Sequence, residues 1–248
     1  MINFRVVKGS LICNSSILKK TIERIIATLK RDPAYKLDDS YSGRQLFNIV
    51  WYRFFQIVRG CFRKLSISTS GIMFCGRRVI IEHGYQVKAG KSLIIEDGVH
   101  INALSMNGIR LGDNVTIAKN AVMTCTGVIA NKGTGITIGN NSSIGAQSFL
   151  GGQGGITIGN DVIMGPQVKI FSENHNFGKG EAIIRKQGES RKGVIIGNNC
   201  WIGSGVTILD GVAIGNGCIL AAGTIVTRSI PENSIVMGSP GKIVKSRA

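Results

Sequence analysis

The stretch Ile196–Arg228, which reads IGNNCWIGSGVTILDGVAIGNGCILAAGTIVTR, repeats every six residues. Each hexad opens with an aliphatic side chain, and most carry a small residue second and a small or β-branched residue fifth. A period of six matches neither an α-helix, at about 3.6 residues, nor an alternating strand, at about two. The stretch therefore predicts a solenoid in which every hexad forms one short strand and one corner. The leading aliphatic residues are expected inside it: Ile196, Ile202, Ile208, Ile214, Leu220 and Val226.

The hexads can be followed back towards Ile95, but the earlier ones are interrupted. A glycine-rich insertion spans Thr126–Thr137, a short one spans Gly151–Gly155, and a longer excursion spans Phe171–Val194. Excursions leave a solenoid at its corners and tend to carry binding surface. The corners also explain the 34 glycines among 248 residues, because tight corners need small residues and positive φ angles.

Two helices are predicted ahead of the repeat. The first runs from Ser15 or Ser16 to about Arg31. The second, with apolar residues at helical spacing, runs from about Arg44 to Leu65. The chain is thus divided into a basic α-helical region at 1–66, the β-helical solenoid at 67–235 and a basic tail at 236–248.

Lysine and arginine outnumber aspartate and glutamate by 30 to 14, and more than half of the net charge of +16 falls within residues 1–66. Two compatible interpretations of this basic region stay open. The helices cap one end of the solenoid, or they lie on an anionic membrane surface. Nucleic acid is not an expected partner, because the sequence has no known reader motif or stacking platform.

Six cysteines without a CxxC pair favour reduced thiols, which suit a cytoplasmic protein. Residues 1–16 lack the apolar core of a signal peptide, and no apolar run approaches the length of a membrane span. A cytoplasmic location is therefore predicted, with the inner membrane face as the surface for any peripheral contact.

Four stretches resemble one known family: ITIGNDVIMGPQVKI at 156–170, SENHNF at 172–177, GVIIGNNCWIGSGVTILD at 193–210, and the segment 220–245. They are similar to hexapeptide-repeat acyltransferases, and within these to the polysaccharide and sugar O-acetyltransferases related to galactoside and maltose acetyltransferases. The resemblance implies a mainly β protein, a left-handed parallel β-helix with a small α-helical N-terminal region. It also implies a homotrimer, acetyl-CoA as co-substrate and no metal. Handedness comes from the resemblance alone, since ordinary crossovers are right-handed.

In that family a histidine on the loop leaving the β-helix is catalytic, and His175 stands in its place. An imidazole can take the proton of a sugar hydroxyl as the oxygen attacks the thioester carbonyl, typically worth about 10²–10⁴-fold. Glu173 is a candidate to orient the ring, although a backbone carbonyl would serve as well. Gln153 and Asn174 are the candidate acceptor-binding residues.

The resemblance also implies a donor site in the groove between neighbouring subunits. Two basic residues of the tail match family positions that meet the phosphates of CoA, although relatives often carry arginine there. Lysine offers a point charge in place of the bidentate fork of arginine. The seven candidate residues for acetyl-CoA are Trp201, Ser204, Ala222, Thr227, Arg228, Lys242 and Lys245.

The acceptor is expected to differ from that of the galactoside and maltose enzymes. The loop 171–194 carries Arg185, Lys186, Arg191 and Lys192, which favours an anionic or lipid-linked glycan. The predicted function is an acetyl-CoA-dependent O-acetyltransferase acting on a sugar or a cell-surface polysaccharide precursor. An N-acetyltransferase of a nucleotide-linked amino sugar and a non-catalytic membrane-associated scaffold stay open. A metal enzyme is disfavoured, because the three histidines are scattered along the chain.

Overall fold

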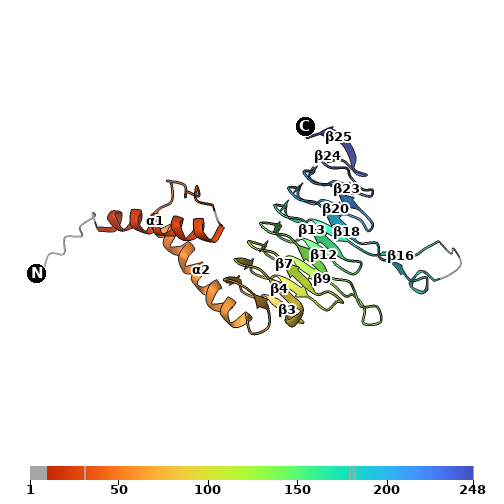
Figure 1. The fold of residues 1–248 in the computed structure, drawn as a ribbon, viewed down its shortest axis with the longest axis horizontal. Coiled ribbons are helices and arrows are strands. Elements are labelled where there is room, and N and C mark those ends of the chain that lie inside the picture. Colours follow the sequence, from red (N-terminus) through yellow and green to blue (C-terminus); the bar gives the residue numbers. More distant parts are fainter. Residues whose placement is uncertain (1–9, 31, 179, 181–182, 248) are drawn as a thin grey trace, which may run out of the picture.

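The computed structural model describes residues 10–30, 32–178, 180 and 183–247. From residue 68 onward the chain forms a left-handed parallel β-helix, a prism of stacked coils with one parallel sheet on each of its three faces (Figure 1). The predicted fold class is therefore confirmed. The described residues include two α-helices, α1 (Ser10–Lys30) and α2 (Gly43–Arg63), at the N-terminal end of the prism. No helix in these described ranges is both long enough and apolar enough to cross a bilayer.

Each complete coil adds one strand to each face. Sheet A consists of β1 (Ser68–Thr69), β4 (Val87–Ala89), β7 (Ile109–Leu111), β10 (Ile136–Ile138), β13 (Ile156–Ile158), β18 (Val194–Ile196) and β21 (Ala213–Ile214). Sheet B consists of β2 (Met73–Cys75), β5 (Leu93–Ile95), β8 (Thr116–Ile117), β11 (Ser143–Ile144), β14 (Ile163–Met164), β19 (Trp201–Ile202), β22 (Ile219–Leu220), β24 (Ser234–Met237) and β25 (Lys242–Ser246). Sheet C consists of β3 (Ile80–Glu82), β6 (His100–Asn102), β9 (Val122–Thr124), β12 (Phe149–Gly151), β15 (Lys169–Phe171), β20 (Thr207–Ile208) and β23 (Ile225–Val226).

The interior of the prism is filled by the leading residues of the hexads. All six leading residues between Ile196 and Val226 are at most 2% exposed, as the repeat predicts. The fifth residues of the same hexads, including Cys200 and Cys218, are buried as well. Since burying one aliphatic side chain is worth about 1.5–3 kcal/mol, these stacked rows hold the coils together.

The corner between sheets A and B, the A–B corner, is bound by a ladder of side chains. A side-chain oxygen on each coil accepts the backbone N–H of the preceding coil at 2.7–2.8 Å. The ladder therefore repeats one bond between the same kinds of atoms from coil to coil. It runs from Lys91 through Asp113, Asn140, Asn160 and Asn198 to Asn216.

The corner between sheets C and A, the C–A corner, is the irregular one. The insertions between β9 and β10, between β12 and β13, and between β15 and β18 all leave the prism there. The last of these contains a two-stranded antiparallel hairpin of β16 (Asn174–His175) and β17 (Glu189–Ser190), and a 3₁₀ turn at Ile184–Lys186. In Figure 1 this hairpin projects from the side of the prism. A smaller 3₁₀ turn, Gly84–Gln86, lies at the same corner of the first coil.

Both N-terminal helices exist, with shifted bounds. Helix α1 begins at Ser10, earlier than predicted, and its predicted end at Arg31 lies outside the described residues. Helix α2 begins at Gly43 because Ser42 and Gln45 form a capping box: the Ser42 hydroxyl accepts the Gln45 N–H, and the Gln45 side chain accepts the Ser42 N–H.

Helix α2 covers an open edge of the prism. No coil precedes the first one, so β2 is an edge strand of sheet B. Arg59 Nε donates to the carbonyl oxygen of Cys75 at 2.9 Å, and Arg63 Nη2 donates to the carbonyl oxygen of Val79 at 2.7 Å. Two of the arginines that make the N-terminal region basic thus bind backbone groups of the first coil. At the other end of sheet B, β25 covers β24 as an antiparallel strand.

The face of α2 that touches the prism is its polar one. The buried residues of α2 are Leu46, Gln56 and Gly60. At Gly60 an added Cβ would lie 1.9 Å from the carbonyl oxygen of Met73, so only glycine permits this approach. The apolar stripe indicated by the helical spacing faces outward, opposite to the usual arrangement of a surface helix. Its exposed residues are Phe47, Val50, Trp51, Phe54, Phe55, Val58, Phe62 and, just past the helix, Leu65.

Candidate active site

The hairpin of β16 and β17 carries His175 away from the prism. His175 lies in β16 with its side chain exposed, and its partner in the antiparallel pair is Glu189 of β17. Among the residues that the structure describes, no hydrogen bond involves the imidazole ring. The ring is therefore presented to the surroundings of the protomer, as an acid–base group that meets its substrate outside the prism must be.

The strand entering the hairpin is fixed by a buried serine. Ser172 is fully buried, and its hydroxyl donates to the carbonyl oxygen of Gly151 at 2.6 Å. The hydroxyl oxygen of Ser172 in turn accepts the N–H of Gly154 at 2.9 Å. These bonds tie the hairpin to the short insertion of the preceding coil, which also carries Gln153. His175 is thus three residues from a rigid point of the core.

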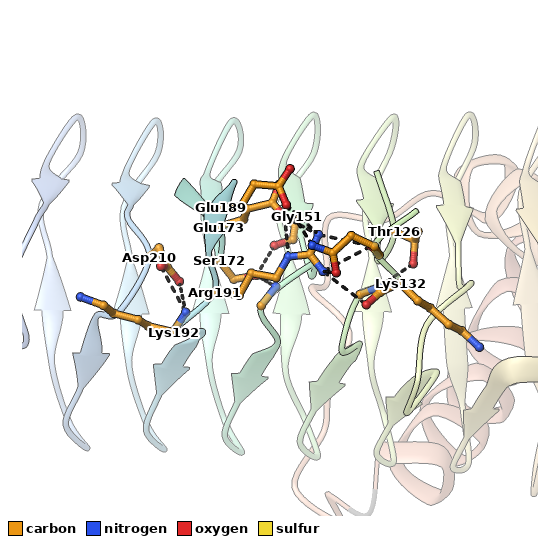
Figure 2. Close-up of polar contacts among 12 residues, drawn as sticks. Thr126, Lys132, Gly151, Ser172, Glu173, Glu189, Arg191, Lys192 and Asp210 are labelled. Atoms are coloured by element: carbon orange, nitrogen blue, oxygen red, sulfur yellow. Dashed lines mark hydrogen bonds and ion pairs between the residues drawn. The ribbon is translucent and has the colours of Figure 1, made fainter. Parts of the chain in front are cut away.

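The strand leaving the hairpin is held by Arg191, which Figure 2 shows at the centre of a polar network. Its Nε donates to Glu173 Oε2 at 2.6 Å, and its Nη2 lies 3.8 Å from Glu189 Oε2. Its Nη1 donates to Asn131 Oδ1 at 2.8 Å and to the carbonyl oxygen of Lys132 at 3.3 Å. Arg191 therefore joins both strands of the hairpin to the insertion of an earlier coil.

Two further groups complete this support. Asn131 Nδ2 donates to Glu189 Oε2 at 2.9 Å, so the residue opposite His175 is bound to the insertion directly. On the next coil, Asp210 Oδ1 accepts the N–H groups of Lys192 and Gly193 at 3.0 and 2.8 Å (Figure 2). The hairpin is consequently anchored to the coil on each side of it.

The structure gives Glu173 a different partner from the predicted one. Its carboxylate is in an ion pair with Arg191, and the side chains of the two residues are only 21% and 16% exposed. In the described part of the chain no hydrogen bond joins Glu173 to the ring of His175. Arg191 is likewise engaged, which removes it from the set of loop cations expected to attract an anionic acceptor. Arg185, Lys186 and Lys192 stay exposed.

The two candidate acceptor residues belong to two different excursions from the C–A corner. Gln153 is half-buried, and its Nε2 would lie 3.4 Å from a Cβ added at Gly127 of the earlier insertion. Asn174 is exposed on β16, next to His175 and paired with Ser190. Both residues therefore border the corner from which His175 projects.

The candidate donor residues form three groups. Trp201 is 56% exposed on the outer face of sheet B, in one row with Ile163 and Ile219 of the adjoining coils. Ser204 and Ala222 follow on the corner between sheets B and C.

The remaining donor residues lie farther along the prism. Thr227 and Arg228 are exposed where β23 ends, at the C–A corner and two coils past the hairpin. Lys242 and Lys245 are exposed on β25, and Lys245 pairs with Ile235 at the end of the row that contains Trp201.

His175 and Trp201 lie on opposite sides of one protomer. A prism with faces A, B and C has its C–A corner opposite face B. His175 projects from that corner, whereas Trp201 stands on face B. One protomer therefore cannot bring the two side chains into a single site, and a site that contains both needs a second copy of the chain.

The other histidines are used elsewhere. His100 Nε2 lies 2.9 Å from Glu82 Oε1 on the outer face of sheet C. His83 adopts a left-handed backbone, with φ of 57°, before the first 3₁₀ turn. Within the described ranges no group of three or more His, Cys, Asp or Glu side chains is placed to hold a metal ion.

Sequence reasoning missed Asn131, Ser172, Glu189 and Asp210, and it assigned Arg191 to the acceptor. The signal for Asp210 was available, since an aspartate before glycine at a corner commonly accepts backbone N–H groups. No local pattern marks Asn131 as a partner of Arg191, because 60 residues separate them.

The comparisons with known proteins agree with this architecture. The family model of the bacterial transferase hexapeptide, six repeats, matches residues 193–228, and the model of the hexapeptide repeat of succinyl-transferase matches 92–125 and 135–165. The galactoside O-acetyltransferase of Escherichia coli is 34% identical over 91 residues, which are 36% of this chain and 43% of that protein. The chain is a hexapeptide-repeat protein, and the curated proteins that it resembles are named as acetyltransferases.

One further relative extends the match over more of the chain. The "Probable acetyltransferase" of Mycobacterium tuberculosis is 30% identical over 202 residues, which are 79% of this chain and 58% of that protein. The chain spans about half the length of the curated relatives it matches. A solved structure of the N-acyltransferase AntD from Bacillus cereus, in complex with a dTDP-linked amino sugar and Coenzyme A, has a TM-score of 0.50 at 16% identity and covers 77% of this chain and 89% of its own. That likeness shows the fold alone.

Proposed function

We propose that this protein is an acetyl-CoA-dependent O-acetyltransferase that acts on a hydroxyl of a sugar or of a cell-surface polysaccharide precursor. The observation that carries the proposal is the exposed imidazole of His175 on a hairpin anchored at both strands. A surface histidine without a role does not need such support. The galactoside O-acetyltransferases of Escherichia coli and Lactococcus lactis, which are relatives of this chain, favour a sugar hydroxyl as the acceptor.

In the proposed reaction His175 acts as general base. The imidazole takes the proton from the acceptor hydroxyl as that oxygen attacks the thioester carbonyl of acetyl-CoA. The carbon–sulfur bond breaks, the thiolate of CoA leaves, and the imidazolium returns the proton to it. Transfer is direct, so the protein forms no acetylated intermediate. The network around Arg191 supplies orientation, because it fixes the backbone on both sides of the base.

A homotrimer is part of the proposal. Trp201, Ser204 and Ala222 would line the acetyl-CoA groove on one protomer, and the hairpin of a neighbour would bring His175 to the thioester. The trimer is supported by the positions of Trp201 and His175, which lie on opposite sides of the prism within one protomer. Lys242 and Lys245 would then meet the phosphates of CoA at the end of the same row. Size-exclusion chromatography with light scattering tests the trimer directly.

The activity is tested with acetyl-CoA and a panel of acceptors that includes galactosides, anionic glycans and nucleotide-linked amino sugars. Thiol release measures turnover, and alkali lability of the product separates an ester from an amide. The proposal expects CoA to bind and an alkali-labile acetyl group to appear on at least one glycan. An alkali-stable product would favour the N-acetyltransferase instead. Intact trimers that do not bind CoA in calorimetry would favour a scaffold without catalysis.

A further inference from the structure

The outward face of α2 is the largest feature that the proposed reaction does not use. Four of its rings form one cluster: Trp51 stacks on Phe47 and Phe54, with centroids 5.9 and 6.0 Å apart, and meets Phe55 edge-on at 5.0 Å. Each of these side chains is between 39% and 57% exposed. An aromatic stripe of this size on the surface marks a binding surface and not a packing surface.

A basic pocket lies at the C-terminal end of this face. Its volume is about 260 Å³, and its lining includes Arg59, Arg63 and Arg78 together with Phe62. Phe62 is 71% exposed and belongs to the aromatic stripe as well. The pocket and the stripe are therefore continuous, with charge at one end and rings along the rest.

One arginine of the pocket, Arg59, has a buried donor with no partner among the described residues. Arg59 uses Nε for the carbonyl of Cys75, but its Nη2 is buried and has no hydrogen-bond partner among the described residues. In the same ranges none of the three arginines is in an ion pair with a carboxylate. The carboxylate of Asp97, on the next coil, has other partners: its Oδ1 accepts the hydroxyl of Tyr52 and the N–H of Arg77. A buried donor with no acceptor is costly, and an anion in the pocket would satisfy it.

We infer that α2 docks this protein on an anionic membrane surface, with the phosphate of a phospholipid in the pocket of Arg59, Arg63 and Arg78 and the aromatic stripe in the interfacial layer. Aromatic side chains favour that layer, and basic residues favour its anionic phosphates. A phospholipid supplies both kinds of group that this surface favours, an apolar layer for the stripe and a phosphate for the three arginines. This inference stands apart from the proposed activity, since neither observation involves His175 or acetyl-CoA.

Flotation of the full chain with vesicles tests it. Vesicles of phosphatidylcholine in which one third of the lipid is phosphatidylglycerol should carry the protein, and vesicles of phosphatidylcholine alone should not. Replacing two members of the stripe in Phe54→Glu/Val58→Glu should lower partitioning more than about tenfold. The matched control is Met106→Glu, which charges a side chain that is 63% exposed at the C–A corner and should partition as the unchanged protein does.

The pocket is tested separately with Arg78→Asn. Arg78 has a φ of 54°, and asparagine tolerates this left-handed conformation. Removing the positive charge of Arg78 should lower partitioning of the protein to the anionic vesicles about fivefold. In the variant Trp201→Phe, Trp51 is the sole remaining tryptophan, and its emission should shift to the blue with anionic vesicles only.

Three results would overturn the inference. One is unchanged flotation of Phe54→Glu/Val58→Glu, with the elution volume and circular dichroism of the folded protein. Another is that the unchanged protein binds neither kind of vesicle and the variant changes its oligomeric state. That result would assign the stripe to contact between copies of the chain. The last is release from the vesicles by inorganic phosphate but not by chloride of equal ionic strength, which would indicate a site for soluble phosphate.

Discussion

The A–B corner and the C–A corner belong to the same coils but follow opposite rules. At the A–B corner one side-chain oxygen bonds to one backbone N–H, coil after coil, from Lys91 to Asn216. At the C–A corner the chain leaves the prism repeatedly, and each excursion is tied to its neighbours by bonds that occur once, such as those of Arg191. The difference separates two tasks: the repeated bonds stack the coils, and the unrepeated ones place individual side chains.

The largest effect is expected at the tip of the C–A excursion. His175→Ala should lower kcat by at least about a hundredfold, because the general base is lost. Binding of CoA should survive, since no donor residue is altered. Steady-state kinetics and calorimetry measure the two properties. Near-normal turnover by this variant would refute the assignment of His175.

A smaller loss is expected when the hairpin is loosened and His175 is kept. Arg191→Ala removes the bonds to Glu173, Asn131 and Lys132, so it should lower kcat about tenfold or more through misplacement of the base. The KM for acetyl-CoA should change little. Arg191→Lys is the matched control, because it keeps the charge but loses the planar fork. Its kcat should lie between that of the unchanged protein and that of Arg191→Ala. Equal kcat for all three would show that the network does not position His175.

A substitution at the A–B corner should lower the stability of the protein without changing its turnover. Asn160→Ala removes the oxygen that accepts the Asn140 N–H at 2.7 Å, so we expect a loss of about 1 kcal/mol in the free energy of unfolding. Urea denaturation measures the loss, and kcat of the folded variant should be unchanged. A fall in kcat comparable to that of Arg191→Ala would remove the distinction between the two corners.

The smallest effect is expected at the corner between sheets B and C, where Asp97 lies. Burial alone raises the pKa of the Asp97 carboxyl. The hydrogen bonds from the Arg77 N–H and the Tyr52 hydroxyl, together with the positive charges of Lys119 and Arg59, outweigh burial, so the pKa is lowered overall. A lowered pKa stabilises the fold above the ordinary range of an aspartate, and this contribution is lost as the pH falls through the folded-state value. Asp97→Asn should therefore unfold with a weaker acid dependence. Identical acid midpoints for both proteins would contradict this.

The sequence predicted the repeating parts of the molecule well. The leading aliphatic residues are buried because a period of six leaves only one inward direction for them. The excursions could be located for the same reason, since each one breaks the period. The exposed position of His175 agrees with the resemblance to the acyltransferases, whereas its role as a base stays a prediction.

Two features could not be predicted from the sequence. Helical spacing shows that α2 has an apolar stripe, but it does not show which side meets the coil, and here Gly60 and the polar side do. The network around Arg191 depends on a contact between two insertions that are far apart in the chain. Contacts made once leave no period in the sequence.

The ladder at the A–B corner has a consequence for how such a protein could change length. Because every rung joins the same kinds of atoms, duplication or deletion of one whole coil would leave a ladder that still closes. Each such event would move everything beyond it along the axis by one strand spacing, about 4.8 Å. The number of coils between β15 and the C-terminal tail therefore sets the distance along the prism axis between His175 and the lysines of β25.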